Sequence, residues 1–143
     1  MAGYWRQPAE TAQALSADGW LRTGDLGVMD AQGYCTLLDR KKDLIIVSGF
    51  NVYPNEIEAV VSGLDGVLEC GAVGTPDARS GEAVKLIVVK RDPALTAQHV
   101  RDYCQSRLTG YKQPRVIEFC PALPKNAVGK ILRRALRDLP PPH

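Results

Sequence analysis

The chain has 143 residues, 45% hydrophobic and 24% charged, with a formal net charge of +2 at pH 7. These values are typical of one globular domain with its own core, and the overall charge argues against a polyanionic partner. No apolar run approaches the roughly 20 residues of a membrane-spanning helix. The N-terminus lacks the basic and apolar segments of a signal peptide, so we expect a cytoplasmic protein.

Cysteines and histidines are scattered along the chain. The cysteines form no C-x-x-C pair, so zinc spacing is absent and we expect no metal site in this chain. His99 and His143 stand alone and form no catalytic pair. We expect free, partly buried thiols in a reducing compartment at Cys35, Cys70, Cys104 and Cys120.

The N-terminal part carries weak structural signals. Pro8 followed by AETAQAL predicts a short helix that ends at the Asp18–Gly19 turn. The stretch WLRTGDLGVMD, at 20–30, predicts a short strand around a polar RTGD turn. The connection from Asp30 to Gly33 is of hairpin type and leads to a predicted strand at 34–38.

The charged stretch DRKKD, at 39–43, separates this part from a stronger pattern. Because a run of charges is unfavourable inside a sheet, we interpret it as a linker or an exposed turn. Helical periodicity follows from Pro54 to an exit at Gly66 and again after Thr96, which caps the second helix. The helical faces are Ile57, Val60, Val61 and Leu64, then Val100, Tyr103, Cys104 and Leu108, and the predicted strands lie at 44–49, 67–74, 82–90 and 116–120.

These elements follow the order strand, helix, strand, strand, helix, strand, which predicts a compact α+β domain. The predicted strand at 82–90 is apolar at successive positions, from Leu86 to Val89, which suggests a strand covered on both faces.

Lys130 stands in PKNAVGKILRR, at 124–134, where three interpretations compete. A phosphate-binding loop requires G-x-x-x-x-G-K-[ST], but Pro124 replaces the first glycine and Ile131 replaces the hydroxyl residue, so this interpretation fails. A catalytic cation and a solvated residue both remain open on spacing alone. Basic residues crowd this end of the chain, which suits a solvated face or a phosphate-bearing ligand: Lys125, Lys130, Arg133, Arg134 and Arg137.

Four stretches in this order carry a resemblance to a known family. They are GWLRTGDLG (19–27), DRKKDLIIVSGFNVYPNEIE (39–58), GEAVKLIVVKRDPALT (81–96) with LTGYKQP (108–114), and LPKNAVGKILRR (123–134). Together they resemble the C-terminal part of the adenylate-forming ligases, the superfamily of acyl-CoA synthetases, adenylation domains and luciferases. The sequences of these stretches are most similar to those of bacterial long-chain fatty-acid–CoA ligases, and the resemblance covers nearly the whole chain.

The resemblance implies an α+β fold: a roughly three-stranded sheet with packed helices plus a β-hairpin, preceded by a remnant of a large domain. We expect that remnant at 1–38, a hinge at 39–43, the small C-terminal domain at 44–138 and a tail at 139–143. No stretch resembles the TSGTTG phosphate loop of the large domain. We therefore expect a C-terminal fragment that is inactive alone.

Three residues match nucleotide-binding positions of the family. The resemblance implies that Asp25 binds the ribose hydroxyls of ATP and that Arg40 reaches its ribose and phosphate oxygens; alone, they read as a turn aspartate and a linker charge. Lys130 matches the catalytic lysine, which contacts the attacking carboxylate and the α-phosphate during adenylation.

Four further residues match moving parts of the family. Lys42 matches the hinge position, although a plain surface lysine looks the same in sequence. Ser48, Gly49 and Phe50 match the loop that lines the pantetheine tunnel, where a glycine admits a thin thiol arm close to the backbone. The alternative is a glycine that merely ends a strand.

Other charged residues can be explained without a role in substrate binding. Glu56 and Glu58 open a predicted helix, where negative charge suits the helix dipole, so we favour a structural role. Lys125, Arg133 and Arg134 read as a solvated basic face, with contact to CoA phosphates left open.

The resemblance implies a ligase that uses ATP, Mg²⁺ held mainly by the large domain, and CoA as substrate. It would convert a fatty acid, ATP and CoA to acyl-CoA, AMP and pyrophosphate through an acyl-adenylate. Expected partners are these substrates and the large N-terminal domain, without nucleic acid. The expected location is the cytoplasm, with peripheral contact at the inner membrane face and the oligomeric state left open.

Two alternatives to a fatty-acid–CoA ligase remain open from the sequence. The acid could be aryl or medium-chain, or the acceptor a carrier-protein thiol. A non-catalytic nucleotide-binding module is the alternative from another class, but only 6% of residues are aromatic and they form no pattern for base stacking.

Overall fold

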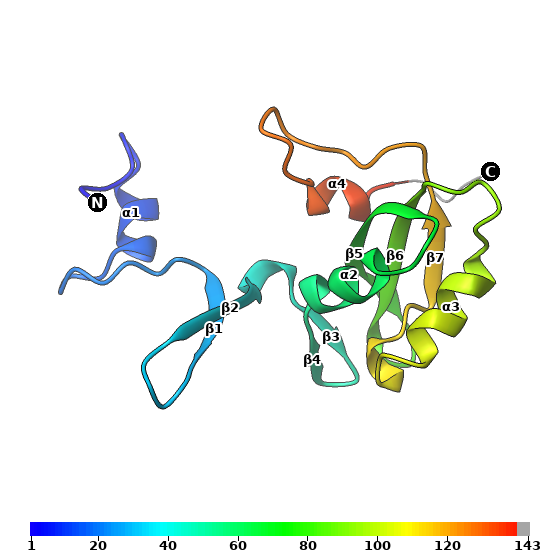
Figure 1. The fold of residues 1–143 in the computed structure, drawn as a ribbon. Coiled ribbons are helices and arrows are strands. Elements are labelled where there is room, and N and C mark those ends of the chain that lie inside the picture. The colour runs from blue at the N-terminus through cyan, green and yellow to red at the C-terminus, as the bar shows by residue number, and fades with distance from the viewer. Residues whose placement is uncertain (140–143) are drawn as a thin grey trace. The chain divides into compact units, whose positions relative to one another are not determined.

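The structure is a computed structural model that describes residues 1–139, so His143 and all of the predicted tail except Leu139 lie outside the described residues. The chain divides into two units, Met1–Lys42 and Asp43–His143. Both units contain helices and strands (Figure 1).

The first unit contains helix α1 (Pro8–Ala14) and the antiparallel strands β1 (Asp25–Met29) and β2 (Cys35–Arg40). The predicted helix and hairpin are therefore confirmed. The Asp30 side chain closes the turn between the strands, because its Oδ1 accepts hydrogen bonds from the backbone N–H groups of Gln32 and Tyr34, both at 2.9 Å.

The charged stretch after this hairpin differs from expectation. Strand β2 continues through Asp39 and Arg40, so the interpretation as an exposed turn is wrong for these two residues. Arg40 lies directly opposite Asp25 in the strand pair, and its Nε is 3.0 Å from Asp25 Oδ1. Opposite charges at facing positions stabilise a strand pair, which explains how charge is accommodated here. A single 3₁₀ turn, Lys41–Asp43, follows.

The second unit is built on a mixed sheet. Strand β6 pairs with β5 in antiparallel fashion and with β7 in parallel, and the β3–β4 hairpin joins it through Val47 opposite Gly81. This confirms the predicted three-stranded sheet with a hairpin. The strands are β3 (Ile45–Val47), β4 (Phe50–Val52), β5 (Val67–Asp77), β6 (Gly81–Lys90) and β7 (Val116–Phe119). The predicted strand at 44–49 is wrong at its end, because Ser48 and Gly49 form the hairpin turn.

Helices α2 (Pro54–Ser62) and α3 (Ala97–Gln105) cover one face of this sheet (Figure 1). Thr96 caps α3 as predicted, since its Oγ1 accepts a hydrogen bond from the His99 N–H at 3.2 Å. Helix α2 ends one turn before its predicted exit at Gly66. Besides the 3₁₀ turn at Lys41–Asp43, two further short helices were not predicted: η2 (Gly110–Lys112) and α4 (Arg133–Arg137). Within residues 1–139, no helix is long and apolar enough to cross a membrane.

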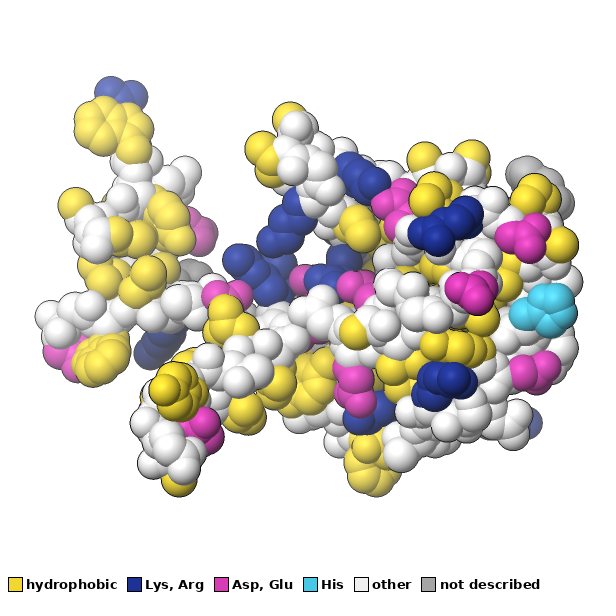
Figure 2. Space-filling view, viewed as in Figure 1, with side chains coloured by type: hydrophobic (Ala, Val, Ile, Leu, Met, Phe, Trp, Pro, Cys, Tyr) yellow, Lys and Arg dark blue, Asp and Glu magenta, His cyan; other side chains and the backbone are white. Residues whose placement is uncertain are grey.

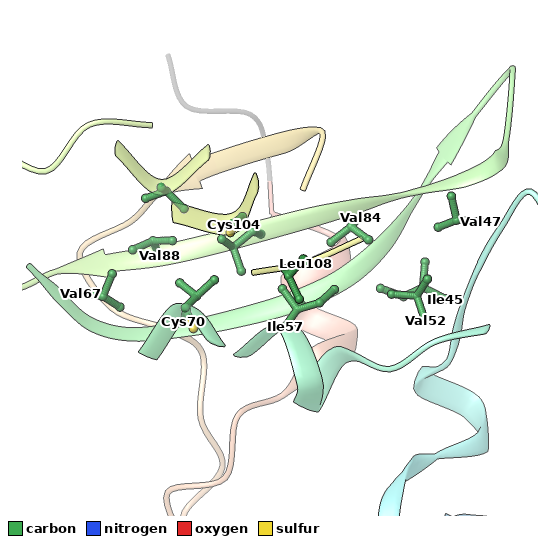
Figure 3. Packing of buried hydrophobic residues seen from close by; sticks show 14 of the residues in the cluster. Ile45, Val47, Val52, Ile57, Val67, Cys70, Val84, Val88, Cys104 and Leu108 are labelled. Atoms are coloured by element: carbon green, nitrogen blue, oxygen red, sulfur yellow. The ribbon is translucent and has the colours of Figure 1, made fainter. Parts of the chain in front are cut away.

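Strand β6 separates two hydrophobic clusters, as its continuous apolar run predicts. On one face Val84, Leu86 and Val88 pack against residues of α2 and α3 (Figure 3). On the other face Ile87 and Val89 pack with residues of the C-terminal segment. That second cluster consists of Val73, Ile87, Val89, Leu123 and Leu136, with Cys120, Ile131 and Leu139 against its edge.

A charged residue interrupts the second face without breaking it. Lys85 is only 7% exposed. Its Nζ lies 2.8 Å from Glu118 Oε2 on the neighbouring strand β7 and 3.4 Å from the carbonyl oxygen of Leu139. A buried ammonium needs such partners, because leaving it unpaired would cost several kcal/mol.

Leu136 should be a main anchor of the C-terminal segment. Its side chain is fully buried, and its Cδ1 lies where a Cβ on Gly71 would clash. We expect Leu136→Ala to lower the free energy of unfolding by about 2–5 kcal/mol, measured by urea denaturation. Leu132→Ala, at a 43% exposed leucine, is the matched control and should cost about 0.5 kcal/mol or less. Equal losses would contradict this packing.

The cysteines should differ sharply in reactivity. Burial raises the pKa of the Cys70 thiol to about 11 and also raises the pKa of Cys104, whereas Cys35 is exposed. Because the thiolate is the reactive form, brief iodoacetamide treatment at pH 8 should label Cys35 first, as mapped by peptide mass spectrometry. In denaturant the cysteines should label alike. Fast native labelling of Cys70 would show that the core is open.

Candidate functional site

The β1–β2 pair presents Asp25 and Arg40 side by side. Their side chains are 30% and 46% exposed, so a ligand can reach both. The turn before them is closed by two hydrogen bonds: the Asp25 N–H donates to Thr23 Oγ1 at 3.1 Å, and the Lys41 N–H donates to the Gly24 carbonyl at 2.8 Å. Gly24 has a φ of +76°, a conformation that favours glycine.

A shallow hollow lies at this end of the first unit, lined by Thr23, Gly24, Arg40, Lys41 and Lys42. A carboxylate beside it can accept hydrogen bonds from vicinal hydroxyls, and a guanidinium can donate to phosphate oxygens. The groups at this hollow can therefore contact hydroxyl and phosphate groups. Lys42 is the last residue of the unit.

The β3–β4 turn is a two-residue turn with left-handed backbone at both positions. Ser48 has a φ of +51° and Gly49 a φ of +83°, as a type I′ hairpin requires. For serine this conformation costs about 1–2 kcal/mol. The Ser48 N–H donates to the carbonyl oxygen of Ser80 at 2.8 Å, which holds the strained turn in place.

The Ser80 turn is itself well braced. Asp77 Oδ1 accepts hydrogen bonds from the Ser80 hydroxyl at 2.8 Å and from the N–H groups of Ser80 and Arg79 at 2.9 Å. These bonds, with the Ser80 hydroxyl first, lower the pKa of Asp77 to about 2. The Asp77 carboxylate is therefore ionised at neutral pH and accepts the hydrogen bonds of the turn that supports Ser48.

Phe50 follows this turn and stacks on an aromatic ring from a distant part of the chain. Its ring centroid is 4.6 Å from that of Tyr111, with 19° between the planes. Phe50 is 54% exposed, whereas Tyr111 packs against the main core cluster. Tyr111 was missed as a supporting residue, since nothing in the spacing of LTGYKQP reveals its neighbour.

Lys130 lies on a tight loop between residues 125 and 131. Lys125 and Ile131 face each other as a β-bridge. Asn126 Oδ1 accepts hydrogen bonds from the N–H groups of Val128 and Lys130, at 3.1 and 2.8 Å. Gly129 turns the backbone with a φ of +81°. The loop is thus closed internally, while the Lys130 side chain is exposed to solvent.

The basic residues around this loop are not all solvated. Lys125 Nζ lies 2.6 Å from Glu69 Oε2 on β5. Arg133 is 17% exposed and its Nη2 lies 2.7 Å from Glu58 Oε2. The interpretation as a solvated basic face is therefore wrong for Arg133, because carboxylates of the domain surround it; Arg134 is exposed, as expected.

The acidic residues at the start of α2 have the structural role that was favoured. Glu56 pairs with Lys112 Nζ at 2.7 Å, and Glu58 Oε1 accepts the N–H of Ala72 on β5 at 2.9 Å. Of the two apolar residues that follow Lys130, Ile131 packs on the second cluster, whereas Leu132 is 43% exposed.

The structure thus gathers the predicted residues into separate groups. Asp25, Arg40 and Lys42 belong to the first unit. In the second unit, the hairpin with Ser48, Gly49 and Phe50 belongs to the helix-covered core, whereas the segment with Lys130 packs on the opposite face of the sheet.

The chain thus combines a small α+β domain that carries an exposed lysine on a closed loop with a preceding carboxylate–guanidinium pair beside a hollow. Sequence comparison identifies the family. The profile of the AMP-binding enzyme C-terminal domain matches residues 56–130. This range is more than half of the chain, so the chain belongs to the AMP-binding enzyme family and carries its C-terminal domain.

Individual proteins are similar to this chain over nearly its whole length. The chain is 59% identical over 138 residues to a long-chain-fatty-acid–CoA ligase of Salmonella typhimurium, covering 96% of this chain and 24% of that protein. ATP-bound MatB from Rhodopseudomonas palustris is 40% identical with a TM-score of 0.86, over 95% of this chain and 27% of the other. The o-succinylbenzoate CoA synthetase MenE from Bacillus subtilis, in complex with its acyl-adenylate, is 36% identical with a TM-score of 0.91, over 100% and 29%. The chain spans about a quarter of these proteins.

Proposed function

We propose that this chain serves as the C-terminal part of a fatty-acid–CoA ligase. The intact enzyme would join a fatty acid to CoA at the expense of ATP, through an acyl-adenylate, with release of AMP and pyrophosphate. The observation that carries the proposal is the 59% identity over 138 residues with a long-chain-fatty-acid–CoA ligase.

Lys130 is proposed as the catalytic cation of the first step. Adenylation brings a carboxylate against the α-phosphate, and a lysine that contacts both anions stabilises the charge of the transition state. The exposed side chain on an internally closed loop supports this role, because the loop can enter a site formed by another domain without losing its own hydrogen bonds.

Asp25 and Arg40 are proposed to bind the ATP and AMP ribose and phosphate. Their direct pairing at 3.0 Å supports a joint role, since the guanidinium keeps the carboxylate oriented before a nucleotide arrives. Mg²⁺ would neutralise phosphate charge and would be held mainly by the large domain.

Lys42 is proposed as the hinge about which the second unit rotates between the two steps. The division of the chain directly after Lys42 supports this. After rotation, the turn with Ser48, Gly49 and Phe50 would line the tunnel for the pantetheine arm of CoA. Apart from its two chain neighbours, a Cβ at Gly49 would meet no atom of residues 1–139 within 4 Å, so the space beside the turn is open.

The large N-terminal domain is the proposed partner. Large hydrophobic side chains are exposed in the first unit (Figure 2), among them Trp5 before α1, Trp20 between α1 and β1, Met29 on β1, Tyr34 before β2 and Leu37 on β2. Exposed apolar area of this kind fits burial against another domain. The chain alone would be inactive, because the phosphate loop and acyl pocket belong to that domain.

A second candidate keeps the chemistry but changes the acid. The high TM-score with the o-succinylbenzoate CoA synthetase favours it, since the same small domain serves an aryl acid there. The rates of acyl-CoA formation with long-chain, medium-chain and aryl acids would separate the candidates. A carrier-protein thiol in place of CoA is tested in the same assay.

The Lys130→Ala variant of the intact enzyme tests the proposal. We expect adenylate formation, followed as acid-dependent exchange of pyrophosphate into ATP, to fall about 10²–10³-fold, which is typical for loss of one preorganised contact. Thioester formation from supplied acyl-adenylate should survive. Arg101→Ala, at an exposed cation on α3, is the control and should leave both steps unchanged. Equal loss of both steps in Lys130→Ala would contradict the assigned role.

The Asp25→Asn variant tests the nucleotide site. The amide weakens the bonds to the ribose hydroxyls, so ATP should bind about 10-fold or more weakly, as expected when a charge-assisted hydrogen bond is lost. Isothermal titration of the intact enzyme with ATP measures this. Asp102→Asn, on the surface of α3, is the matched control. An unchanged affinity for ATP in Asp25→Asn would remove this carboxylate from the site.

A further inference from the structure

Arg133 lies at the centre of a polar cluster that joins three parts of the second unit. Its guanidinium meets Glu58 in a two-pronged contact, with Nε 3.3 Å from Oε1 and Nη2 2.7 Å from Oε2. Nη2 also donates to Asn55 Oδ1 at 2.6 Å. Nη1 lies 3.7 Å from Asp43 Oδ2. Such a planar fork fixes orientation as well as distance.

The cluster is shielded from water and connected further. The Arg133, Glu58 and Asp43 side chains are only 17%, 17% and 14% exposed. Glu58 Oε1 also accepts the N–H of Ala72 at 2.9 Å, so the fork links α4 to both α2 and β5. Ion pairs of this burial are screened less by salt than surface pairs are.

Arg133 is also the first residue of α4, directly after the Lys130 loop. The Leu132 N–H closes the base of the loop on the Pro124 carbonyl at 2.9 Å. Helix α4 has five residues, too few to be stable by itself, so tertiary contacts must set its position. Those contacts include the buried Leu136 side chain, the fork at Arg133 and Arg137 Nη2, which lies 3.9 Å from Asp43 Oδ1.

We infer that Arg133 is a positioning residue for Lys130: it fixes the C-terminal arm of the Lys130 loop to α2 and to Asp43. The N-terminal arm is fixed separately by Lys125 on Glu69. Asp43 directly follows Lys42 and is the first residue of the second unit. Its contact with Arg133 therefore links the C-terminal arm of the loop to the start of that unit. This inference rests on the proposed function for the role of Lys130.

The test is Arg133→Met in the intact enzyme, which keeps most of the apolar stem and removes the fork. Adenylate formation should fall about 10–100-fold, because small misplacements of a catalytic group cost rate on this scale. Thioester formation from supplied acyl-adenylate should stay within about twofold, since Lys130 is not proposed to act in that step. Arg134→Met, at the exposed neighbour, should leave adenylate formation unchanged.

Glu58→Gln removes the charge of the carboxylate partner in the same Arg133–Glu58 contact. The amide oxygen can still accept the Ala72 N–H, while the charged fork is lost. It should show the same split between the two steps with a smaller loss, and it decides the matter if Arg133→Met fails to fold. Equal loss of both steps, or no loss of adenylate formation in either variant, would overturn the inference.

A measurement on the 143-residue chain separates this inference from the proposed function. Hydrogen exchange at the amides of Gly129 and Lys130 should be faster in Arg133→Met than in Arg134→Met, whatever the enzyme does. If the exchange responds but the wild-type intact enzyme forms no adenylate, the proposed function fails while the support of the loop stands. If the exchange does not respond, the inference fails by itself.

Discussion

Burial of β6 on both faces is the constraint on which the second unit depends. Val84, Leu86 and Val88 meet the helices, while Ile87 and Val89 meet the C-terminal segment. Full burial of each such side chain contributes about 1.5–3 kcal/mol, so neither covering layer can be lost without exposing half of the strand. The two layers also carry different working parts. The β3–β4 hairpin belongs to the helix-covered side, and the Lys130 loop belongs to the other, so one strand holds both in place.

Carboxylates decide which of the C-terminal cations remain available. Glu69 takes up Lys125, and Glu58 with Asp43 takes up Arg133, whereas Lys130 stays exposed on its loop. A cluster that looks uniform in sequence is thus divided into cations that pair with carboxylates of the domain and cations that stay exposed, among them Lys130 and Arg134. The same division appears in the first unit, where the pairing of Arg40 with Asp25 both closes the strand pair and presents two polar groups to the hollow.

Local patterns predicted the regular elements, and distant contacts account for most of the errors. The helical period and Thr96 predicted α3, and the apolar run predicted β6, because each signal lies within the element itself. The turn at Ser48 was missed, since serine seldom adopts the left-handed conformation that the Ser80 carbonyl stabilises here. Helix α4 exists through Leu136 and Arg133, which no local pattern reveals. Family resemblance named the candidate site residues one by one, but it could not show the Asp25–Arg40 contact, the Phe50–Tyr111 stack or the fork at Arg133.

The two exposed turns of the second unit are held in place by different contacts. The turn at Ser48 and Gly49 is held by the Ser80 carbonyl and the ring of Tyr111, and the Lys130 loop by Glu69 and the Arg133 fork. Because these supports share no residue, a substitution that reshapes one turn need not disturb the other. Under the proposed function, evolution could therefore adjust the turn assigned to the thiol acceptor while the cation assigned to acid activation keeps its place. If that function holds, a domain of this construction can diversify in acceptor while it retains a common first step.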